Sequence, residues 1–306
     1  MLKFTKMTLD RCSTQRKDSA WTKKQMLEAG FLILCEDKNL VYGNTYQPII
    51  LNYKQIVSFS LESSTMVFLG YSSHPLYAID VTDMKKVEDQ LLELGQFSEL
   101  RQVASRLDND TASALMLSRG LCHWHRNNRF CGRCGHPTGS IEAGNALVCS
   151  GCNHQTFPRT DPVVIMLVTK QFEDGIERVL LGRHKHRAND VYTCLAGYVD
   201  QCETLEQAVQ REVFEESGIR VDDVHYVASQ PWLFPSSLML GFTAHATTDQ
   251  INVDKDELDT ADWFSRDELV RFSEREDGCK LPNEDTIARY LIEQWIQMTP
   301  IERNVS

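Results

Sequence analysis

The chain has 306 residues, of which 42% are hydrophobic and 25% are charged, and its formal net charge at pH 7 is −11. This composition is typical of ordinary globular domains and excludes a disordered or fibrous chain. The length predicts about two domains. The negative charge argues against a broad surface for nucleic-acid backbone, although it leaves room for a small basic patch.

The pattern of apolar residues and cysteines indicates the cellular compartment of the protein. No stretch approaches the ~20 consecutive apolar residues of a membrane helix, and residues 1–10 lack the apolar core of a secretory signal. Six of the ten cysteines follow no spacing pattern: Cys12, Cys35, Cys122, Cys194, Cys202 and Cys279. Such scattered cysteines in a long chain indicate reduced thiols rather than a disulfide framework. We therefore expect a soluble, cytoplasmic protein.

Residues 1–107 predict a small α+β domain. Short strands are expected over 31–35, 49–51 and 66–70, and leucines at helical intervals between 84 and 107 predict one helix that closes the domain. A polar break with N-cap residues then precedes a helix over about 112–125, within a linking segment assigned to 108–130. This part of the chain suggests no chemistry of its own.

Two C-x-x-C pairs indicate a metal site in residues 131–157. Fourteen residues separate Cys131-Gly-Arg-Cys134 from Cys149-Ser-Gly-Cys152. Each pair can close a tight turn that aims two thiolates at one ion, and a hairpin between them completes the tetrahedron that Zn²⁺ prefers. Four thiolates leave no open position, so we expect a structural zinc ribbon. A redox-active pair is the weaker alternative.

Residues 158–300 alternate predicted strands and helices, which indicates a mixed α/β domain. An apolar, β-branched run at 163–168 predicts a buried strand, and further strands are expected at 179–181, 226–229, 238–246 and 263–264. Helices are expected over 204–217 and 283–298. The first of these helices carries the strongest chemical signal in the chain.

That helix collects carboxylates on one face. Glu212, Glu215 and Glu216 stand at i, i+3 and i+4, so their side chains converge. Glu203 lies in the preceding loop within reach of them, and Arg211 is placed to orient a glutamate. Hard oxygen ligands at this density suit Mg²⁺ or Mn²⁺ with a substrate phosphate. The plain alternative is a solvated acidic face.

Residues Gly197–Ile219 match the Nudix box, G-x5-E-x7-R-E-U-x-E-E-x-G-U with U aliphatic, at every specified position. The segment therefore resembles the Nudix hydrolases. The resemblance implies an α/β/α sandwich with a mixed sheet over residues 158–300. It also implies metal-dependent hydrolysis of a nucleoside diphosphate linked to another group, with cations that neutralise charge on the diphosphate oxygens.

Downstream, Ser229-Gln-Pro-Trp-Leu-Phe-Pro-Ser-Ser237 is similar to the S-Q-P-W-P-F-P-x-S array of the NADH pyrophosphatase subfamily. Leu233 replaces the usual proline, for which we expect a small change in loop rigidity. The zinc ribbon ahead of the box fits the same subfamily. The resemblance implies an NAD(H) diphosphatase that cleaves NADH, and NAD⁺ less readily, into a nicotinamide mononucleotide and AMP. It also implies a homodimer.

The resemblance carries over site residues by position. Glu212, Glu215 and Glu216 would bind Mg²⁺ or Mn²⁺, Glu257 would add a further acidic ligand or base, and Glu203 and Arg211 would support them. The identity of the general base stays open. The substrate side would be formed by Phe157 and Tyr198, which match base-stacking positions, and by Gln230, Trp232, Ala288 and Ala196.

Three other functions remain open from the sequence. The same chemistry could remove the NAD cap from an RNA 5′ end, with the basic run at residues 183–187 as the place to look for RNA contacts. The protein could instead be a zinc-ribbon adaptor that senses a nucleotide without turnover, although its complete set of glutamates argues against this. ADP-ribose or diadenosine substrates are disfavoured by the downstream array.

Overall fold

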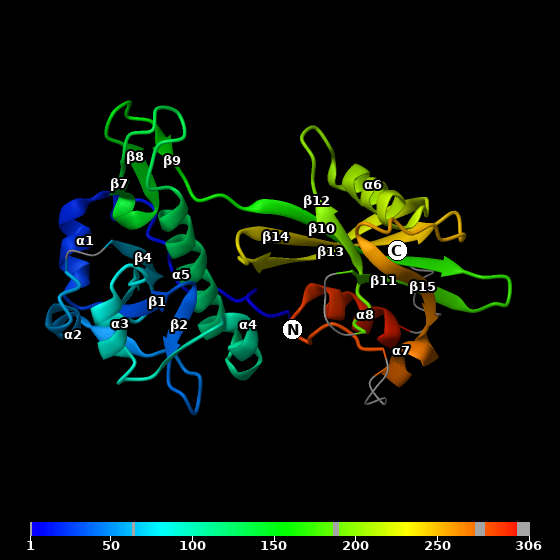
Figure 1. The fold of residues 1–306 in the computed structure, drawn as a ribbon, viewed down its shortest axis with the longest axis horizontal. Helices are drawn as coiled ribbons and strands as arrows, with labels where there is room; N and C mark the ends of the chain where they lie inside the picture. The colour runs from blue at the N-terminus through cyan, green and yellow to red at the C-terminus, as the bar shows by residue number, and fades with distance from the viewer. Residues whose placement is uncertain (1, 63–64, 186–189, 273–278, 299–306) are drawn as a thin grey trace. The chain divides into compact units, whose positions relative to one another are not determined.

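The computed structural model in Figure 1 describes residues 2–62, 65–185, 190–272 and 279–298. Its contacts divide the chain into two compact units. One unit consists of Leu2, residues 161–231 and the chain from residue 237 onward, and the other of residues 3–160 and 232–236. The segment 232–236 therefore clusters with the chain that precedes residue 161. All the domain boundaries expected from the sequence, including those of residues 158–300, remain predictions.

The first unit in chain order is built on a sheet of six strands with the order β4-β5-β1-β2-β6, and β3 pairs with β1. Its strands are β1 (Gly30–Cys35), β2 (Lys38–Val41), β3 (Ile50–Asn52), β4 (Met66–Tyr71), β5 (Pro75–Asp80) and β6 (Gln96–Ser98). Its helices are α1 (Ser19–Met26), α2 (Tyr53–Ser58), α3 (Lys85–Leu91), α4 (Leu100–Val103) and α5 (Asn109–Asn127).

Both faces of this sheet are covered, because alternate residues of each strand point to opposite sides. In β1, Leu32 and Leu34 join a cluster with Leu115 and Met116 of α5. Their neighbours, such as Ile33, join a second cluster with residues of α2 and α3. The predicted α+β domain is present, and so is the helix expected at about 112–125.

The helix expected between residues 84 and 107 is wrong in its extent. The segment contains α3, the strand β6, the short α4 and a 3₁₀ turn over Ala104–Arg106. The strand pairs with β2 and places Ser98 opposite Asn39. Pairing with a sheet edge satisfies backbone groups that a continuous helix would satisfy internally, so tertiary contacts override the local leucine spacing.

The cysteine-containing segment forms a small three-stranded sheet in the order β7-β8-β9, with β7 (Thr138–Ile141), β8 (Ala146–Cys149) and β9 (Gln155–Thr156). Both hairpins are antiparallel, and Thr138 stands opposite Cys149. The hairpin between the two cysteine pairs is therefore present as expected.

The second unit contains a mixed sheet in the order β13-β14-β10-β11-β15, with β12 paired to β10. Its strands are β10 (Asp161–Gln171), β11 (Glu177–His184), β12 (Leu195–Tyr198), β13 (Val221–Trp232), β14 (Ser237–Ala246) and β15 (Leu258–Ser265). Its helices are α6 (Leu205–Ser217), α7 (Arg266–Phe272) and α8 (Ile287–Gln297). Strand β10 runs parallel to β14 and antiparallel to β11 and β12.

Helices α6 and α8 lie on opposite faces of this sheet (Figure 1). Val164 and Met166 of β10 pack in the cluster that includes α6, whereas Ile165 and Leu167 pack in the cluster that includes α8. Residues 163–168 of strand β10 are therefore buried on both faces, which explains why this run is apolar without interruption. The α/β/α sandwich with a mixed sheet is confirmed.

Two further expectations can be compared with the structure. All ten cysteines lie in the described part of the chain, and none of them is in a disulfide. No helix in the described ranges is both long and apolar enough to cross a membrane.

Candidate active site

Helix α6 is fixed at both ends by its own sequence. The Thr204 side chain accepts a hydrogen bond from the Gln207 N–H, and the Gln207 side-chain oxygen accepts one from the Thr204 N–H, which completes a capping box. At the other end Gly218 adopts a left-handed conformation with φ of 71°, which glycine allows at little cost. Ala208 and Val209 are fully buried on the sheet side. The register of the glutamates on the helix is thereby set.

Arg211 joins the carboxylates of this helix to the preceding loop. Its Nη1 donates to Glu212 Oε1 at 2.8 Å and to Glu215 Oε2 at 2.9 Å. Its Nε and Nη2 donate to the two oxygens of Glu203 at 2.6 and 2.9 Å, and Nη2 also donates to the Tyr198 carbonyl. This fork holds the pKa of Glu203 at about 2, with the hydrogen bonds from Arg211 as the main cause. One cation therefore orients three carboxylates.

Strand β12 approaches the helix closely at Gly197. A Cβ at this position would lie 1.9 Å from the carboxyl carbon of Glu212. The absence of a side chain on residue 197 is thus what lets the Glu212 carboxylate lie against the strand. The backbone of the neighbouring Ala196 acts on Glu216 in the direction that lowers the pKa of this carboxyl group, against the larger effect of burial. The first glycine of the box and the helix glutamates form one structural unit.

Glu216 is the most buried member of the cluster, with 2% of the residue exposed. Its Oε2 is buried and has no hydrogen-bond partner. Burial, reinforced by the charges of Glu212 and Glu257, raises the pKa of Glu216 to about 8. A buried, unpartnered carboxylate oxygen is costly unless a proton or a cation binds it. The donor set fits a divalent cation that prefers oxygen ligands.

Glu257 comes from a different part of the chain. It lies in the turn ahead of β15, where its N–H donates to the Asp254 carbonyl. Its charge is among the causes that raise the pKa values of Glu212 and Glu216, after burial as the main cause. Arg211 therefore joins Glu203, Glu212 and Glu215, and the charges of Glu212 and Glu257 act on Glu216. That these residues form one metal site remains a prediction.

The predicted substrate residues of this unit differ in their surroundings. Tyr198, at the end of β12, is 57% exposed. Ala196 is half-buried in the same strand. Gln230 is completely buried, and its amide bonds the Asp285 carbonyl and the Ile287 N–H at the start of α8. Ala288 is buried in α8. The Gln230 amide is thus engaged in fixing α8.

Phe157 and Trp232, the other two predicted substrate residues, belong to the unit formed by residues 3–160 and 232–236. Phe157 follows β9 and is 54% exposed. Trp232 is half-buried, and its ring packs edge-on against Phe4 and Phe234 at centroid distances of 6.1 and 5.0 Å. Each of these two aromatic side chains keeps a surface that solvent can reach.

The four cysteines of the ribbon form one cluster, with all their sulfur atoms within 4.8 Å of one another. The N–H groups of Cys131 and Cys149 donate to the carbonyls of His136 and His154, so the two turns have the same design. Hydrogen bonds from the Cys152 and Gly151 N–H groups lower the pKa of Cys149 to about 6. Thiolates at this spacing match tetrahedral zinc, for which Zn–S bonds of ~2.3 Å place sulfurs about 3.8 Å apart.

The basic run at residues 183–187 is partly described. Arg183 pairs with Asp190 at 2.8 Å, and the Lys185 ammonium donates to the Lys255 carbonyl. Residues 186 and 187 lie outside the described residues. The described cations of the run thus bind groups of the same unit.

The sequence analysis missed the contacts of Arg119 and Gly120 in α5. Arg119 donates a hydrogen bond to the Leu233 carbonyl, and a Cβ on Gly120 would lie 2.4 Å from Leu233 Cδ1. More than a hundred residues separate the two segments, so no local pattern could reveal the contact. A glycine in a helix interior was the available signal, since such a glycine often marks a close approach.

Comparison with protein families agrees with this architecture. Residues 159–282 match the NUDIX domain, residues 126–157 match the NADH pyrophosphatase zinc ribbon domain, and residues 28–124 match an NADH pyrophosphatase-like rudimentary NUDIX domain.

Curated relatives cover most of the chain. The NAD-capped RNA hydrolase NUDT12 of Homo sapiens is 34% identical over 97% of this chain and 74% of its own length. The NAD-capped RNA hydrolase NudC of Klebsiella pneumoniae is 42% identical over 66% of this chain and 73% of its own length. The chain therefore belongs to the Nudix hydrolases, in the family of zinc-ribbon NADH pyrophosphatases and NAD-capped RNA hydrolases.

Proposed function

We propose that this protein is a Mg²⁺- or Mn²⁺-dependent NAD(H) diphosphatase, which hydrolyses the dinucleotide to a nicotinamide mononucleotide and AMP. The observation that carries the proposal is the unpartnered, buried Oε2 of Glu216 beside Glu212 and Glu257. The match to the NADH pyrophosphatase zinc ribbon supports this substrate class. The predicted ribbon zinc would have a structural role, because four thiolates fill its coordination sphere.

Each residue of the cluster has a part in this reaction. Water attacks one phosphorus of the diphosphate, the P–O bond to the bridging oxygen breaks, and each product leaves with one phosphate. A divalent cation held by Glu212, Glu216 and Glu257 would neutralise the charge that develops on the phosphate oxygens. Arg211 orients Glu203, Glu212 and Glu215. One of the glutamates accepts the proton of the attacking water.

The substrate's base and nicotinamide would meet aromatic surfaces. The exposed rings of Tyr198 and Phe157 are suited to stacking, which contributes about 1–3 kcal/mol per base and tolerates different bases. Trp232 would contribute its solvent-facing part. Ala196 and Ala288 would leave room for the dinucleotide, and Gln230 would act by fixing the start of α8.

The test incubates the purified protein with NADH and Mn²⁺ and separates the products by chromatography. Reduced nicotinamide mononucleotide and AMP are expected from the wild type and not from Glu216→Gln. Glu206→Gln is the matched control, because Glu206 is exposed in the first turn of the same helix. Equal activity of Glu216→Gln and wild type would refute the assigned cation site.

Removal of the NAD cap from RNA is the second candidate, favoured by the names of the relatives NUDT12 and NudC. The chemistry at the diphosphate is the same, so the two substrates must be compared directly. Competition between NADH and an RNA with a 5′ NAD cap at equal concentrations measures the preference through the ratio of their kcat/KM values. A protein that cleaves neither substrate nor other dinucleotides would be a nucleotide sensor.

Two further properties belong to the proposal. The protein is a homodimer by its resemblance to the family, which light scattering after size exclusion tests through the molar mass. It is cytoplasmic, supported by ten cysteines without a disulfide. Fractionation of cells that express the tagged chain tests this location.

A further inference from the structure

The segment Trp232–Ser236 links β13 to β14 and packs on residues that precede the ribbon in the chain. Arg101 lies over both the Trp232 and the Phe234 ring, with its guanidinium carbon 5.2 and 4.6 Å from the two centroids. Phe4 packs edge-on against the same rings. The side chains of this segment are therefore held by several aromatic and cationic partners.

The backbone of the segment has its own partner in Arg119 of α5. The Arg119 guanidinium donates to the Leu233 carbonyl and also lies over the Phe234 ring, 4.6 Å from its centroid. The residue is buried, with 8% exposed. A guanidinium that bonds a carbonyl and stacks on the next aromatic ring fixes both the position and the rotation of that peptide.

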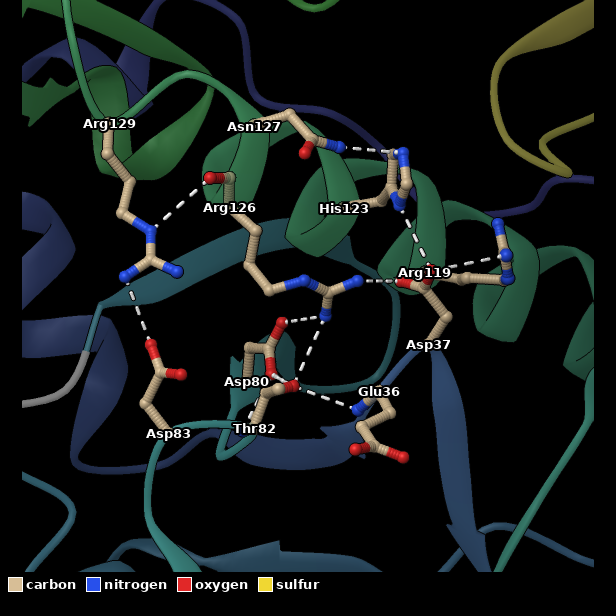
Figure 2. Close-up of polar contacts among 10 residues, drawn as sticks. All are labelled: Glu36, Asp37, Asp80, Thr82, Asp83, Arg119, His123, Arg126, Asn127 and Arg129. Atoms are coloured by element: carbon tan, nitrogen blue, oxygen red, sulfur yellow. Dashed lines mark hydrogen bonds and ion pairs between the residues drawn. The ribbon is translucent and has the colours of Figure 1, made fainter.

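A network of charges in turn orients Arg119 (Figure 2). Asp37, in the turn between β1 and β2, accepts from Arg119 Nη2 at 3.4 Å and forms a bond with His123 Nδ1 at 3.0 Å. Arg126 pairs with the same carboxylate and with Asp80 on β5. Arg119, His123 and Arg126 therefore project from α5 toward one carboxylate that the sheet holds in place.

We propose that Arg119 is a positioning residue for substrate binding: through its bond to Leu233 and its contact with Phe234, it holds Trp232 in the conformation that binds the dinucleotide. This inference rests on the proposed function, because the proposed function is what assigns Trp232 to substrate binding. It assigns Arg119 no contact with the reacting atoms. Its loss therefore weakens binding and leaves the bond-breaking step largely intact.

Three variants test the role. Arg119→Met keeps an unbranched apolar stem but removes the guanidinium group, and with it the hydrogen bond and the charge. Gly120→Ala pushes on Leu233 from the same helix without changing charge, and alanine favours the helix, so this variant retains the fold. Arg106→Met is the control, because Arg106 makes a comparable contact, at 4.6 Å, with the ring of Tyr46, which is not part of the segment.

Two readouts separate positioning from general stability. Steady-state kinetics with NADH should show a KM about tenfold higher for Arg119→Met, the effect of losing one charge-assisted hydrogen bond, with kcat changed less than about twofold. Hydrogen exchange should become faster in peptides that cover residues 232–240, whereas exchange in the interior of α5 stays as in the wild type. Gly120→Ala should also raise the KM and speed up the exchange of residues 232–240. Arg119→Lys should give values of both quantities between those of the wild type and those of Arg119→Met.

An unchanged KM together with unchanged exchange in both variants would overturn the proposal. So would a fall in kcat at constant KM, or faster exchange throughout the unit, which would indicate a merely structural role. If the wild type cleaves no dinucleotide, the proposed function fails. The substrate-binding part of the inference then fails with it, and the exchange data decide separately whether Arg119 holds the segment.

Discussion

Replacing Glu216 by glutamine should stabilise the cation-free protein while it abolishes turnover. In the cation-free fold the pKa of Glu216 is raised from 4.5 to about 8, mainly by burial. A carboxyl group whose pKa is higher in the folded state binds its proton more tightly there than in the unfolded chain. Folding therefore becomes less favourable as the pH rises from about 4.5 to about 8, where the proton is lost.

The size of the effect follows from the same values. At about 1.4 kcal/mol per pKa unit, the shift corresponds to a penalty of up to about 5 kcal/mol above pH 8. Glutamine has no charge to bury and avoids this penalty. For a unit of this size, the Tm of Glu216→Gln should exceed that of the wild type by roughly 10 °C at pH 8.5. At pH 5 the two proteins should differ little.

Calorimetry at pH 5 and pH 8.5 measures this difference. The buffer contains no Mg²⁺ or Mn²⁺ and no chelator, so that a zinc ion at the ribbon stays bound. Added Mn²⁺ at 100 times its Kd should roughly halve the difference at pH 8.5, because it stabilises the wild type by about 2.7 kcal/mol while the variant lacks a ligand oxygen. Glu206→Gln should behave like the wild type in all conditions.

If the Tm values of the wild type and of Glu216→Gln depend on pH in the same way without cation, the reasoning is refuted. Equal stabilisation of both proteins by Mn²⁺ would refute the assignment of Glu216 as a ligand. The two outcomes are independent, because the first concerns the burial of charge and the second concerns the identity of the ligand.

Three other substitutions test different parts of the molecule. Cys149→Ser should release zinc and lower the Tm of its unit, which metal analysis and calorimetry detect; full zinc retention would contradict the four-thiolate site. Gly197→Ala should reduce kcat at least a hundredfold, because the new Cβ would lie 1.9 Å from the Glu212 carboxyl carbon. Gly132→Ala is its control, since a Cβ there meets no atom within 4 Å. Arg211→Lys should lower kcat by roughly tenfold or more, because lysine cannot form the fork that orients the loop and helix carboxylates; wild-type kinetics would show that the fork has no role.

The sequence predicted helix α6 well because its determinants are local. Thr204, Gln207 and Gly218 set the ends of α6 through capping interactions that span a few residues. The spacing of Glu212 and Glu216 then places both on one face of the helix. The cysteine turns of the ribbon are local in the same way.

Other elements depend on partners that are distant in the chain. Strand β6 forms because β2 offers an edge to pair with, although its surroundings contain helically spaced leucines. The raised pKa of Glu216 depends on its burial in the fold and on the charge of Glu257, which comes from a distant turn, and the buried amide of Gln230 depends on the start of α8. None of these neighbours can be read from the local sequence.

The sequence by itself determined the chemical types and their local order: four thiolates in two turns, and glutamates on one face of a capped helix. Only the tertiary structure decided which glutamate is buried away from water, which glycine leaves space for a carboxylate, and which arginine contacts the segment Trp232–Ser236. The reason is physical. Capping and helical spacing act over a few residues, whereas desolvation and close packing depend on every group that the fold brings near.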